Sequence, residues 1–267
     1  MHERERHNII LRAVRERPVA TVQEICEWTG ASEATARRDI AALHLQKKLR
    51  RVRGGAEALV PAQAPGMLGR PYEMNEWIDV EAKRAIADAA VELCEEGDSI
   101  IINGGTTTFQ MVHGLAAKRL NVLTNSFPIA EHLIKHSTCN VTVPGGLIYR
   151  EQKIILSPFD NDVTGSFNAR RLFMGAQGVG RLGVMESDPL LVAAEQKLIG
   201  QAAELVVVVA SHKLRERPSL ICCPLDRVHA LITDDGITEE ETAMLEARGV
   251  VVRKVAVPAR KGARSVA

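Results

Sequence analysis

SEATARRDIAALHLQKKLRRVRGG, residues 32–55, is the stretch of sequence that decides the fold of the first domain. Ser32 is a favourable helix N-cap, because its hydroxyl can accept a hydrogen bond from an early helical N–H. Ala36, Ile40 and Leu43 follow at spacings i, i+4 and i+7, which is one buried stripe of a helix. The stretch therefore predicts a short amphipathic helix that begins just after Ser32.

The other face of this predicted helix is small and basic. Ala34 and Arg38 point away from the apolar stripe, and Thr35 and Arg37 flank it. Small side chains let a helix enter a major groove closely, where Ala34 can touch a thymine methyl and arginines can reach phosphates or guanine edges. We therefore expect a recognition helix whose DNA-contacting residues are Ser32, Ala34, Thr35, Arg37 and Arg38.

A second basic stretch follows the helix and ends at Gly54-Gly55. Residues 35–55 carry seven Lys/Arg and one acid. Residues 49–52 and 56–60 predict a short β-hairpin around the two glycines, which is the wing of a winged helix-turn-helix. A solvated basic face with no partner is the alternative. The DNA contacts expected from this stretch are Lys47, Lys48, Arg50, Arg51 and Arg53.

The residues before this stretch complete the domain. Residues 3–16 predict a first helix, and Thr21 is the candidate N-cap of a second helix over residues 22–28. Gly30 follows in a three-residue turn, where it supplies the backbone freedom that a tight helix reversal needs. The order helix, helix, turn, basic helix, basic hairpin predicts a winged helix-turn-helix domain over residues 1–60.

The charge of the chain is unevenly distributed. The net charge is +1, but residues 1–60 hold 12 Lys/Arg against 8 Asp/Glu, whereas the remainder holds 22 against 25. A basic head on a slightly acidic body predicts that only the head meets a polyanion. The 267 residues with 46% apolar content are enough for one small domain and one larger domain with its own core.

The composition also limits which cellular compartment and which cofactors we expect for this protein. The five cysteines show neither C-x-x-C nor zinc-site spacing, so reduced thiols are expected. The N-terminus lacks the apolar region of a signal peptide, and no apolar run approaches the roughly 18 residues of a membrane span. Scattered histidines show no metal-ligand spacing. We expect a cytoplasmic protein without a membrane partner, metal or cofactor.

Residues 61–79 are predicted to be a linker, since residues 61–71 hold three prolines and two glycines. Residues 70–77 could pack on either domain. A second domain is expected over residues 80–257. The last residues, 258–267, are small and basic and predict a disordered tail, which is solvated or touches DNA.

In the second domain, apolar strands alternate with helices of 10–15 residues. This alternation predicts βαβ units around a mainly parallel sheet, so the fold class of this domain is α/β. Residues 205–209 are five consecutive apolar residues, which is typical of a strand covered on both faces. The predicted strands span residues 99–103, 120–124, 139–143, 171–174, 205–209, 228–233 and 250–255.

Several of these strands end in small or polar residues. Open parallel sheets bind ligands beyond the carboxyl ends of their strands. The turn over residues 104–108 opens a helix, so its N–H groups and hydroxyls favour an anion such as phosphate. Ordinary βα turns and a surface lysine are the alternatives. The residues expected to bind an anionic effector are Gly104, Gly105, Thr106, Thr107, Thr108, Asn125, Ser126, Gly145, Gly146 and Lys213.

In this order, the motifs resemble the DeoR family of bacterial transcriptional repressors, over residues 3–255. The likeness is carried by residues 32–43, 51–56, 105–107, 124–126, 145–146 and Lys213. It implies a body of the sugar-phosphate isomerase and CoA-transferase type and a phosphorylated sugar as effector. One small head makes too few contacts for operator-level affinity, so we expect a homodimer or homotetramer on double-stranded operator DNA.

Four further stretches resemble the subgroup of this family that regulates ascorbate use, which implies an acidic sugar phosphate. They are residues 53–58, 103–106, 155–158 and 194–197. Two positions depart from the family, because Ala210 and Arg170 stand where the family has Asp. The loss of carboxylates predicts a more positive pocket, with a more anionic effector or a weaker response to it.

The function expected from the sequence is repression of an operon for carbohydrate uptake or catabolism, with release of the operator when a phosphorylated sugar or sugar acid binds. A transcriptional activator is one alternative. A sugar-phosphate isomerase with an appended head is another, but isomerisation needs a well-placed base. The strand ends hold Ala210, Thr and Asn instead of a carboxylate. We therefore expect no catalytic residues.

Overall fold

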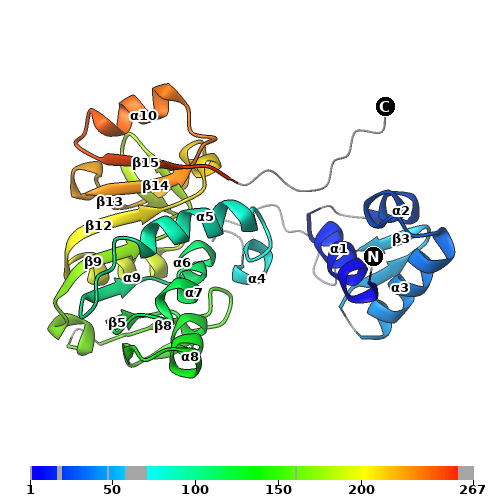
Figure 1. The fold of residues 1–267 in the computed structure, drawn as a ribbon, viewed down its shortest axis with the longest axis horizontal. Helices are drawn as coiled ribbons and strands as arrows, with labels where there is room; N and C mark the ends of the chain where they lie inside the picture. The colour runs from blue at the N-terminus through cyan, green and yellow to red at the C-terminus, as the bar shows by residue number, and fades with distance from the viewer. Residues whose placement is uncertain (1, 17–19, 47, 58–70, 160, 258–267) are drawn as a thin grey trace. The chain divides into compact units, whose positions relative to one another are not determined.

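The chain, in a computed structural model, divides into two compact units, Met1–Gly66 and Met67–Ala267 (Figure 1). The structure describes residues 2–16, 20–46, 48–57, 71–159 and 161–257. Lys47, most of the predicted linker (residues 61–70) and the predicted tail (residues 258–267) lie outside the described residues.

The first unit, here called the head, contains the three predicted helices. They are α1 (Glu3–Glu16), α2 (Val22–Thr29) and α3 (Glu33–Leu45). Their apolar faces meet in one small core, which is the packing that the helical spacing predicts. The buried residues of this core include Ile10, Val14, Ile25, Ala36, Ile40, Leu43 and Leu49.

Local sequence sets the ends of these helices. Thr21 and Glu24 form a capping box at the start of α2, with the Glu24 N–H 3.2 Å from Thr21 Oγ1 and the Thr21 N–H 2.9 Å from Glu24 Oε2. Gly30 ends α2 in the left-handed region, at φ 64°. Ser32 caps α3 by accepting a hydrogen bond from the Thr35 N–H at 3.4 Å.

The wing forms as predicted and gains a third strand. β2 (Arg50–Val52) and β3 (Gly55–Glu57) are the antiparallel hairpin, and the two-residue strand β1 (Ala20–Thr21) pairs with the other edge of β3. A Cβ at Gly55 would lie 2.2 Å from the Ala20 carbonyl oxygen, so only glycine allows this pairing. The wing therefore belongs to the same sheet as the residues that enter α2.

The second unit, here called the sensor, is built on a seven-stranded sheet in which every neighbouring pair is parallel. The predicted mainly parallel α/β class is thus confirmed. In spatial order the strands are β15 (Val251–Val255), β14 (Ala230–Asp234), β12 (Ala202–Val208), β9 (Ala169–Met174), β4 (Ser99–Ile102), β5 (Asn121–Thr124) and β6 (Asn140–Thr142).

The chain enters this sheet at β4, builds outward through β5 and β6, and returns to β9 on the other side of β4. The strand order therefore reverses between β4 and β9. Such a switch point opens a crevice at the carboxyl ends of its strands, because the two connections leave in opposite directions.

Apolar cores fill both faces of the sheet. Successive residues of β12 alternate between them: Leu205 and Val207 belong to one core, and Val206 and Val208 belong to the other, together with Ile86 of α5. The helices of the sensor are α5 (Val80–Val91), α6 (Thr106–Gln110), α7 (Val112–Leu115), α8 (Phe127–His136), α9 (Pro189–Ile199) and α10 (Glu239–Glu246), with the 3₁₀ turns η1 (Val163–Ser166), η2 (Ser211–Leu214) and η3 (Leu225–Arg227).

Several elements differ from the sequence prediction. The helix expected after the turn over residues 104–108 consists of two short helices, α6 and α7. Two small antiparallel sheets were missed, because their strands are only three or four residues long. They are the hairpin of β7 (Leu147–Tyr149) with β8 (Ile154–Leu156), and the sheet of β10 (Gly178–Gly180), β11 (Gly183–Glu186) and β13 (Leu220–Cys223).

Part of the stretch assigned to the linker folds with the sensor. α4 (Tyr72–Asn75) carries the buried Tyr72, whose N–H donates to the Glu151 carbonyl oxygen at 2.8 Å. Lys153 Nζ lies 5.2 Å from the centre of the Tyr72 ring, within cation–π range. These contacts show that this stretch packs on the sensor.

Among the described helices, none combines the length and apolarity needed to cross a bilayer.

Candidate functional site

The predicted recognition helix α3 presents its basic face to solvent. Ala34, Arg37 and Arg38 are exposed, and Thr35 is half-buried. The Arg37 guanidinium pairs with Glu33 at 2.8 Å, in an exposed i,i+4 arrangement that is easily exchanged for another anion. The surface of α3 is thus small and basic, as a helix that enters a DNA groove must be.

A buried carboxylate holds α3 in place. Asp39 lies on the inner side of the helix and accepts two hydrogen bonds from Arg6 of α1, from Nε at 2.7 Å and from Nη2 at 3.1 Å. A bidentate pair of this kind fixes orientation as well as distance. Sequence analysis counted Asp39 only as a charge within the basic stretch, although its function is to anchor the helix.

The wing places further cations next to α3. Lys48, Arg50, Arg51 and Arg53 are exposed, and Arg50 pairs with the carboxylate of Glu57 on the neighbouring strand. Lys47 lies outside the described residues. This arrangement suits contacts with a phosphate backbone on either side of a groove.

In the sensor, side-chain amides tie the strand ends together at the switch point. Asn103 Oδ1 accepts a hydrogen bond from the Gly175 N–H at 3.0 Å, which joins the ends of β4 and β9. The Gly104 N–H donates to Asn125 Oδ1 at 2.8 Å, which joins β4 to β5. The predicted residues that follow β4 and β5 therefore do lie side by side.

Two of the predicted glycines have a steric reason to be glycine. A Cβ at Gly104 would lie 2.2 Å from the side chain of Ile154, and a Cβ at Gly146 would lie 2.1 Å from the Leu156 carbonyl oxygen. The hairpin of β7 and β8 thus packs directly against both glycines. Their presence does not by itself indicate a phosphate site.

The predicted hydroxyl groups divide into two kinds. Thr108 is fully buried and donates to the carbonyl oxygen of Asn103 at 2.9 Å, and Ser126 caps α8 by accepting from the Ile129 N–H. Both hydroxyls stabilise their own turns. Thr106 and Thr107 are half-buried at the start of α6, where they border the strand ends.

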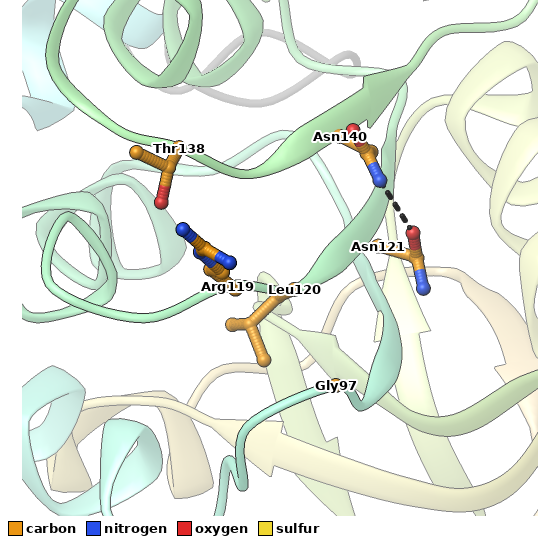
Figure 2. Close-up of a pocket in the computed structure, with 6 residues that line it drawn as sticks. All are labelled: Gly97, Arg119, Leu120, Asn121, Thr138 and Asn140. Carbon is orange, nitrogen blue, oxygen red and sulfur yellow. Dashed lines mark hydrogen bonds between the residues drawn. The ribbon is translucent and has the colours of Figure 1, made fainter.

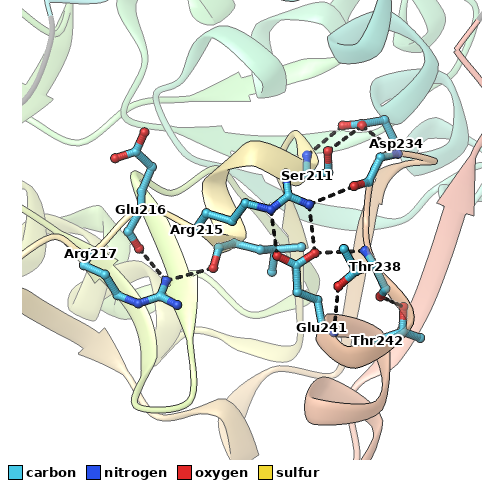
Figure 3. Close-up of polar contacts among 10 residues, drawn as sticks. Ser211, Arg215, Glu216, Arg217, Asp234, Thr238, Glu241 and Thr242 are labelled. Atoms are coloured by element: carbon cyan, nitrogen blue, oxygen red, sulfur yellow. Dashed lines mark hydrogen bonds and ion pairs between the residues drawn. The ribbon is translucent and has the colours of Figure 1, made fainter.

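A polar network fixes the turn that carries Lys213. η2 follows β12, and Ser211 donates to Asp234 from both its N–H and its hydroxyl, at 2.7 Å each (Figure 3). Arg215, just after the turn, bonds the Gly236 carbonyl oxygen at 2.9 Å and pairs with Glu241 of α10. Lys213 is therefore held at the carboxyl edge of the sheet, as the sequence predicts from its position after a strand.

The structure adds a buried lysine that sequence analysis missed. Lys83 lies on the inner face of α5, where its Nζ donates to the carbonyl oxygen of Asn75. Burial lowers the pKa of Lys83 to about 8, with Asp79 opposing this shift and the positive charge of Lys213 adding to it. Two lysines thus act on each other at this edge. A lysine three residues before Ile86, on an apolar stripe, could have been noticed in the sequence.

Two buried carboxyl groups complete this edge. Glu195 of α9 accepts hydrogen bonds from Asn103 Nδ2 at 3.1 Å and from Cys222 Sγ at 3.0 Å, and Glu186 at the end of β11 accepts one from the Gln177 N–H at 2.9 Å. The sequence argument against a catalytic base concerned the strand ends that hold Ala210, Thr and Asn. The two buried carboxyl groups come from other elements, Glu195 from α9 and Glu186 from the second sheet.

Arg170, which stands where the family has Asp, does not make the effector pocket more positive as the sequence led us to expect. Arg170 pairs with Glu95 at 3.1 Å and Asp98 at 3.2 Å, at the amino end of β4 and β9. It lies at the opposite edge from Lys213 and cannot make an effector pocket more positive. Ala210 is buried at the carboxyl edge.

A hollow of about 430 Å³ also lies at the amino edge of the sheet (Figure 2). Its one charged side chain is Arg119, and its two asparagines bond each other, Asn140 Nδ2 to Asn121 Oδ1 at 3.0 Å. This hollow lacks the paired cations of the carboxyl edge. We therefore place the candidate effector site at the carboxyl ends of β4, β5, β9 and β12.

Three of the scattered histidines meet on the surface of the sensor. The ring centres of His113 and His132 are 5.2 Å apart, and those of His132 and His136 are 4.7 Å apart. Within the described ranges, no set of three His, Cys, Asp or Glu side chains is arranged to hold a metal ion.

Two protein-family models match this chain, one in each unit. The model described as "DeoR-like helix-turn-helix domain" matches residues 6–61, and that described as "DeoR C terminal sensor domain" matches residues 78–235.

Curated relatives match almost the whole chain. The "HTH-type transcriptional regulator UlaR" of Shigella dysenteriae serotype 1 (strain Sd197) is 34% identical over 255 residues, which are 96% of this chain and 100% of the relative. The protein of the same name from Escherichia coli O127:H6 (strain E2348/69 / EPEC) matches with the same identity and coverage. These relatives confirm the predicted likeness to the ascorbate-utilisation subgroup.

Solved structures resemble the chain more distantly. A ribose 5-phosphate isomerase A from Methanocaldococcus jannaschii is 18% identical with a TM-score of 0.37, covering 49% of this chain and 52% of that one. A translation initiation factor eIF-2B from Pyrococcus horikoshii OT3 is 16% identical with a TM-score of 0.35, covering 80% and 68%.

The relatives that match the full length are named as transcriptional regulators, which favours the regulator over the isomerase alternative. The head has the exposed basic helix and wing of a DNA-binding domain, and the sensor has two lysines, Lys83 and Lys213, that act on each other at the carboxyl edge of its sheet. From both family matches and from the relatives, this chain belongs to the DeoR family of transcriptional regulators.

Proposed function

We propose that this protein represses an operon for carbohydrate uptake or catabolism and leaves its operator when a phosphorylated sugar or sugar acid binds the sensor. The observation that carries the effector class is the lysine pair at the switch point. Lys83 is buried and its pKa is lowered by burial and by the nearby charge of Lys213. Two cations held this close are best stabilised by an anion with more than one charge, such as a phosphate.

The neighbouring turns supply neutral hydrogen-bonding groups for the same ligand. Thr106 and Thr107 border the strand ends, and the backbone after Gly104 turns away from the sheet there. Asn125 and Ser126 belong to the adjacent turn, where they mainly hold the shape of the edge. In this assignment Lys83 and Lys213 select the phosphate, while the turns determine which sugar fits.

At the head, we assign base contacts to α3 and phosphate contacts to the wing. Arg37 and Arg38 extend from the exposed face of α3, and Arg51 and Arg53 extend from the wing. Phosphate contacts give affinity that depends on salt, and base-edge contacts give sequence preference. Two or four copies of the chain would place heads on successive half-sites and so reach operator-level affinity.

Release follows from linkage between the two sites. The effector weakens operator binding only to the extent that it binds better to the sensor arrangement in which the heads no longer match the half-sites. A tenfold weakening of operator binding requires a differential affinity worth about 1.4 kcal/mol.

The test combines a thermal-shift screen of sugar phosphates with gel shifts on the DNA upstream of the gene. Lys213→Ala should lower effector affinity by about 10- to 150-fold, the equivalent of a charge-assisted contact of roughly 1.5–3 kcal/mol. The variant should bind operator normally and fail to release it. Lys135→Ala is the matched control, because Lys135 is an exposed lysine that pairs with Glu131 on α8.

Two results would contradict the assignment. If Lys213→Ala releases DNA at the same effector concentration as the unchanged protein, the site lies elsewhere. If unphosphorylated sugars release DNA as well as their phosphates do, the lysine pair does not select the effector.

A further inference from the structure

The two buried carboxyl groups of the effector edge are placed differently from each other. Glu186 is 4% exposed and Glu195 is 5% exposed. Glu186 is joined to the end of β9 through the Gln177 N–H, two residues beyond Gly175. Glu195 is joined to the end of β4 through the amide of Asn103. Both therefore belong to the switch point at which we place the effector.

The hydrogen-bond pattern favours the ionised form of Glu195. Asn103 Oδ1 accepts from the Gly175 N–H, so the amide cannot be reversed and its NH₂ group must donate to Glu195 Oε1. The Cys222 thiol lies 3.0 Å from Glu195 Oε2 and is its donor. A carboxyl group that receives donors on both oxygens is stabilised as the carboxylate. Burial raises the pKa of Glu195 to about 7, and the hydrogen bonds from Cys222 and Asn103 oppose this rise, so Glu195 is the more readily ionised member of the pair.

Glu186 has the opposite surroundings. Its Oε1 accepts from the Gln177 N–H, whereas its Oε2 makes no hydrogen bond within the described part of the chain. A second negative charge buried beside ionised Glu195 is unfavourable, so Glu186 keeps its proton. Since Oε1 is the acceptor in the bond from Gln177, the proton resides on Oε2.

The direction of the pKa shift agrees with this assignment. Burial, and next the charge of Glu195, raise the pKa of Glu186 well above its ordinary value. The N–H groups of Gln177 and Ser187 and the charge of Lys213 act in the opposite direction. The pKa of the Cys222 thiol is raised, first by burial and then by Glu195, so Cys222 remains a neutral donor.

We propose that Glu186 is a protonated hydrogen-bond donor of the effector site, whose Oε2–H binds an acceptor oxygen on the sugar part of the phosphorylated effector. The proposal rests on the function proposed above and deepens it. Lys83 and Lys213 bind the phosphate, while Glu186 selects an effector with a carboxylate, carbonyl or hydroxyl oxygen at the matching position. A neutral donor serves an anionic ligand here, because an ionised Glu186 would repel it.

This assignment predicts how affinity depends on pH. Effector affinity falls as the pH rises through the raised pKa of Glu186, because the donor is lost and a negative charge appears. Lys83, whose pKa is about 8, loses its positive charge in the same direction. A Glu186 variant is therefore needed to separate the two contributions.

Glu186→Gln is the informative change, because a neutral amide keeps one donor and one acceptor. With 6-phosphogluconate as the probe, calorimetric titration of the full-length variant below neutral pH should give an affinity within about twofold of the unchanged protein, and a shallower loss of affinity toward alkaline pH. Glu186→Ala removes the donor and should cost roughly 2- to 12-fold at neutral pH, the equivalent of one hydrogen bond. Glu216→Gln, an exposed carboxyl just beyond η2, is the control and should behave as the unchanged protein.

A second measurement needs no effector. Infrared spectra at a pH above the Glu195 pKa of about 7 should show the carbonyl stretch of a protonated carboxylic acid in the unchanged protein and in Glu216→Gln, and should lack it in Glu186→Gln. The proposal is overturned if this band is absent from the unchanged protein. It is also overturned if Glu186→Gln abolishes binding of 6-phosphogluconate, since Glu186 would then act as an ionised acceptor.

Lys213→Ala distinguishes this failure from a failure of the proposed function. If Lys213→Ala no longer binds 6-phosphogluconate while Glu186→Ala binds it with full affinity, the position of the effector site is supported and the role assigned to Glu186 is wrong. If both variants keep full affinity, the site itself is misplaced.

Discussion

The head and the sensor hold their functional charges in opposite ways. In the head, Arg38 and Arg53 are exposed at the surface. In the sensor, Lys83, Glu186 and Glu195 are buried among hydrogen-bond partners and other charges. Exposed charges act on a polyanion through the sum of many weak, salt-screened contacts, whereas buried charges act strongly on one small ligand at short range.

The buried ion pair of the head is an instructive exception. Asp39 and Arg6 are turned inward and hold α3 against α1. This pair positions α3, whose exposed face is the predicted recognition surface, and His7 Nε2 also lies 3.3 Å from Asp39 Oδ1. This comparison between the head and the sensor shows that a buried charge indicates a ligand-binding site only where a ligand can reach it.

The largest expected effect tests whether the two units fold independently. Leu43→Ala removes a fully buried side chain from the small core of the head and should lower the free energy of unfolding by about 2–5 kcal/mol. Leu45→Ala is the matched control, because Leu45 is 83% exposed. Denaturation followed by the fluorescence of Trp28 in the head should shift, and that of Trp77 in the sensor should not. A common shift at both tryptophans would show one cooperative unit.

The second prediction concerns the buried cation of the sensor. The pKa of Lys83 is lowered from 10.5 to about 8, so between these values the unfolded chain binds more protons than the folded one. The free energy of unfolding should therefore rise with pH across this window, by on the order of 1–3 kcal/mol, while affinity for a phosphate falls. Lys83→Met should remove the pH dependence, stabilise the sensor at neutral pH and abolish the phosphate response. Calorimetric melting across this pH range provides the measurement. Equal slopes for both proteins would contradict it.

The third prediction tests whether α3 of the head is the recognition helix. Arg38→Ala should weaken operator binding by roughly 1–3 kcal/mol if the side chain reads a base, and by less if it touches only phosphate. Fluorescence anisotropy with operator DNA at moderate salt measures this. Arg84→Ala, an exposed arginine of the sensor, should leave the affinity unchanged. Full operator affinity in an Arg37→Ala, Arg38→Ala double variant would show that α3 is not the recognition helix.

The smallest effect is expected at the wing. Neutralising Arg51 and Arg53 should weaken specific and non-specific DNA alike and flatten the salt dependence, by about 0.9 in log–log slope for each phosphate that is no longer neutralised. Titrations at several salt concentrations with operator and with unrelated DNA give the two slopes. A slope equal to that of the unchanged protein would place the wing away from the DNA.

The sequence predicts the head almost completely, because its determinants are local. Thr21, Gly30 and Ser32 specify helix ends within a few residues, and the apolar spacing of α3 specifies its buried face. The pairing of β1 and the anchoring role of Asp39 were missed. A strand of two residues has no periodicity to detect, and its partner lies more than thirty residues away, at Ala56.

The sensor is less predictable, because its site is assembled from distant segments. The strand ends after β4 and β5 could be found from the alternation of strands and helices. Lys83 and Glu195 come from helices, and Glu186 comes from a small second sheet, so no single short motif contains all three, although Glu195 lies in the stretch 194–197. Arg170 was connected with the effector pocket because of its likeness to a family position, although the predicted strand 171–174 already put it at the amino end, where β9 begins.

The third strand of the head has a consequence for the kind of DNA this protein selects. β1 pairs with the wing, and the Val22 N–H at the start of α2 donates to the Gly54 carbonyl oxygen at the wing tip, at 2.9 Å. The wing and the helical pair therefore form one rigid body with a set separation between groove-reading and backbone-binding surfaces. We expect such a body to discriminate DNA by groove width as well as by base edges, because a duplex of the wrong width must deform before both surfaces engage. Sequence preference can thus extend to base pairs that no side chain touches.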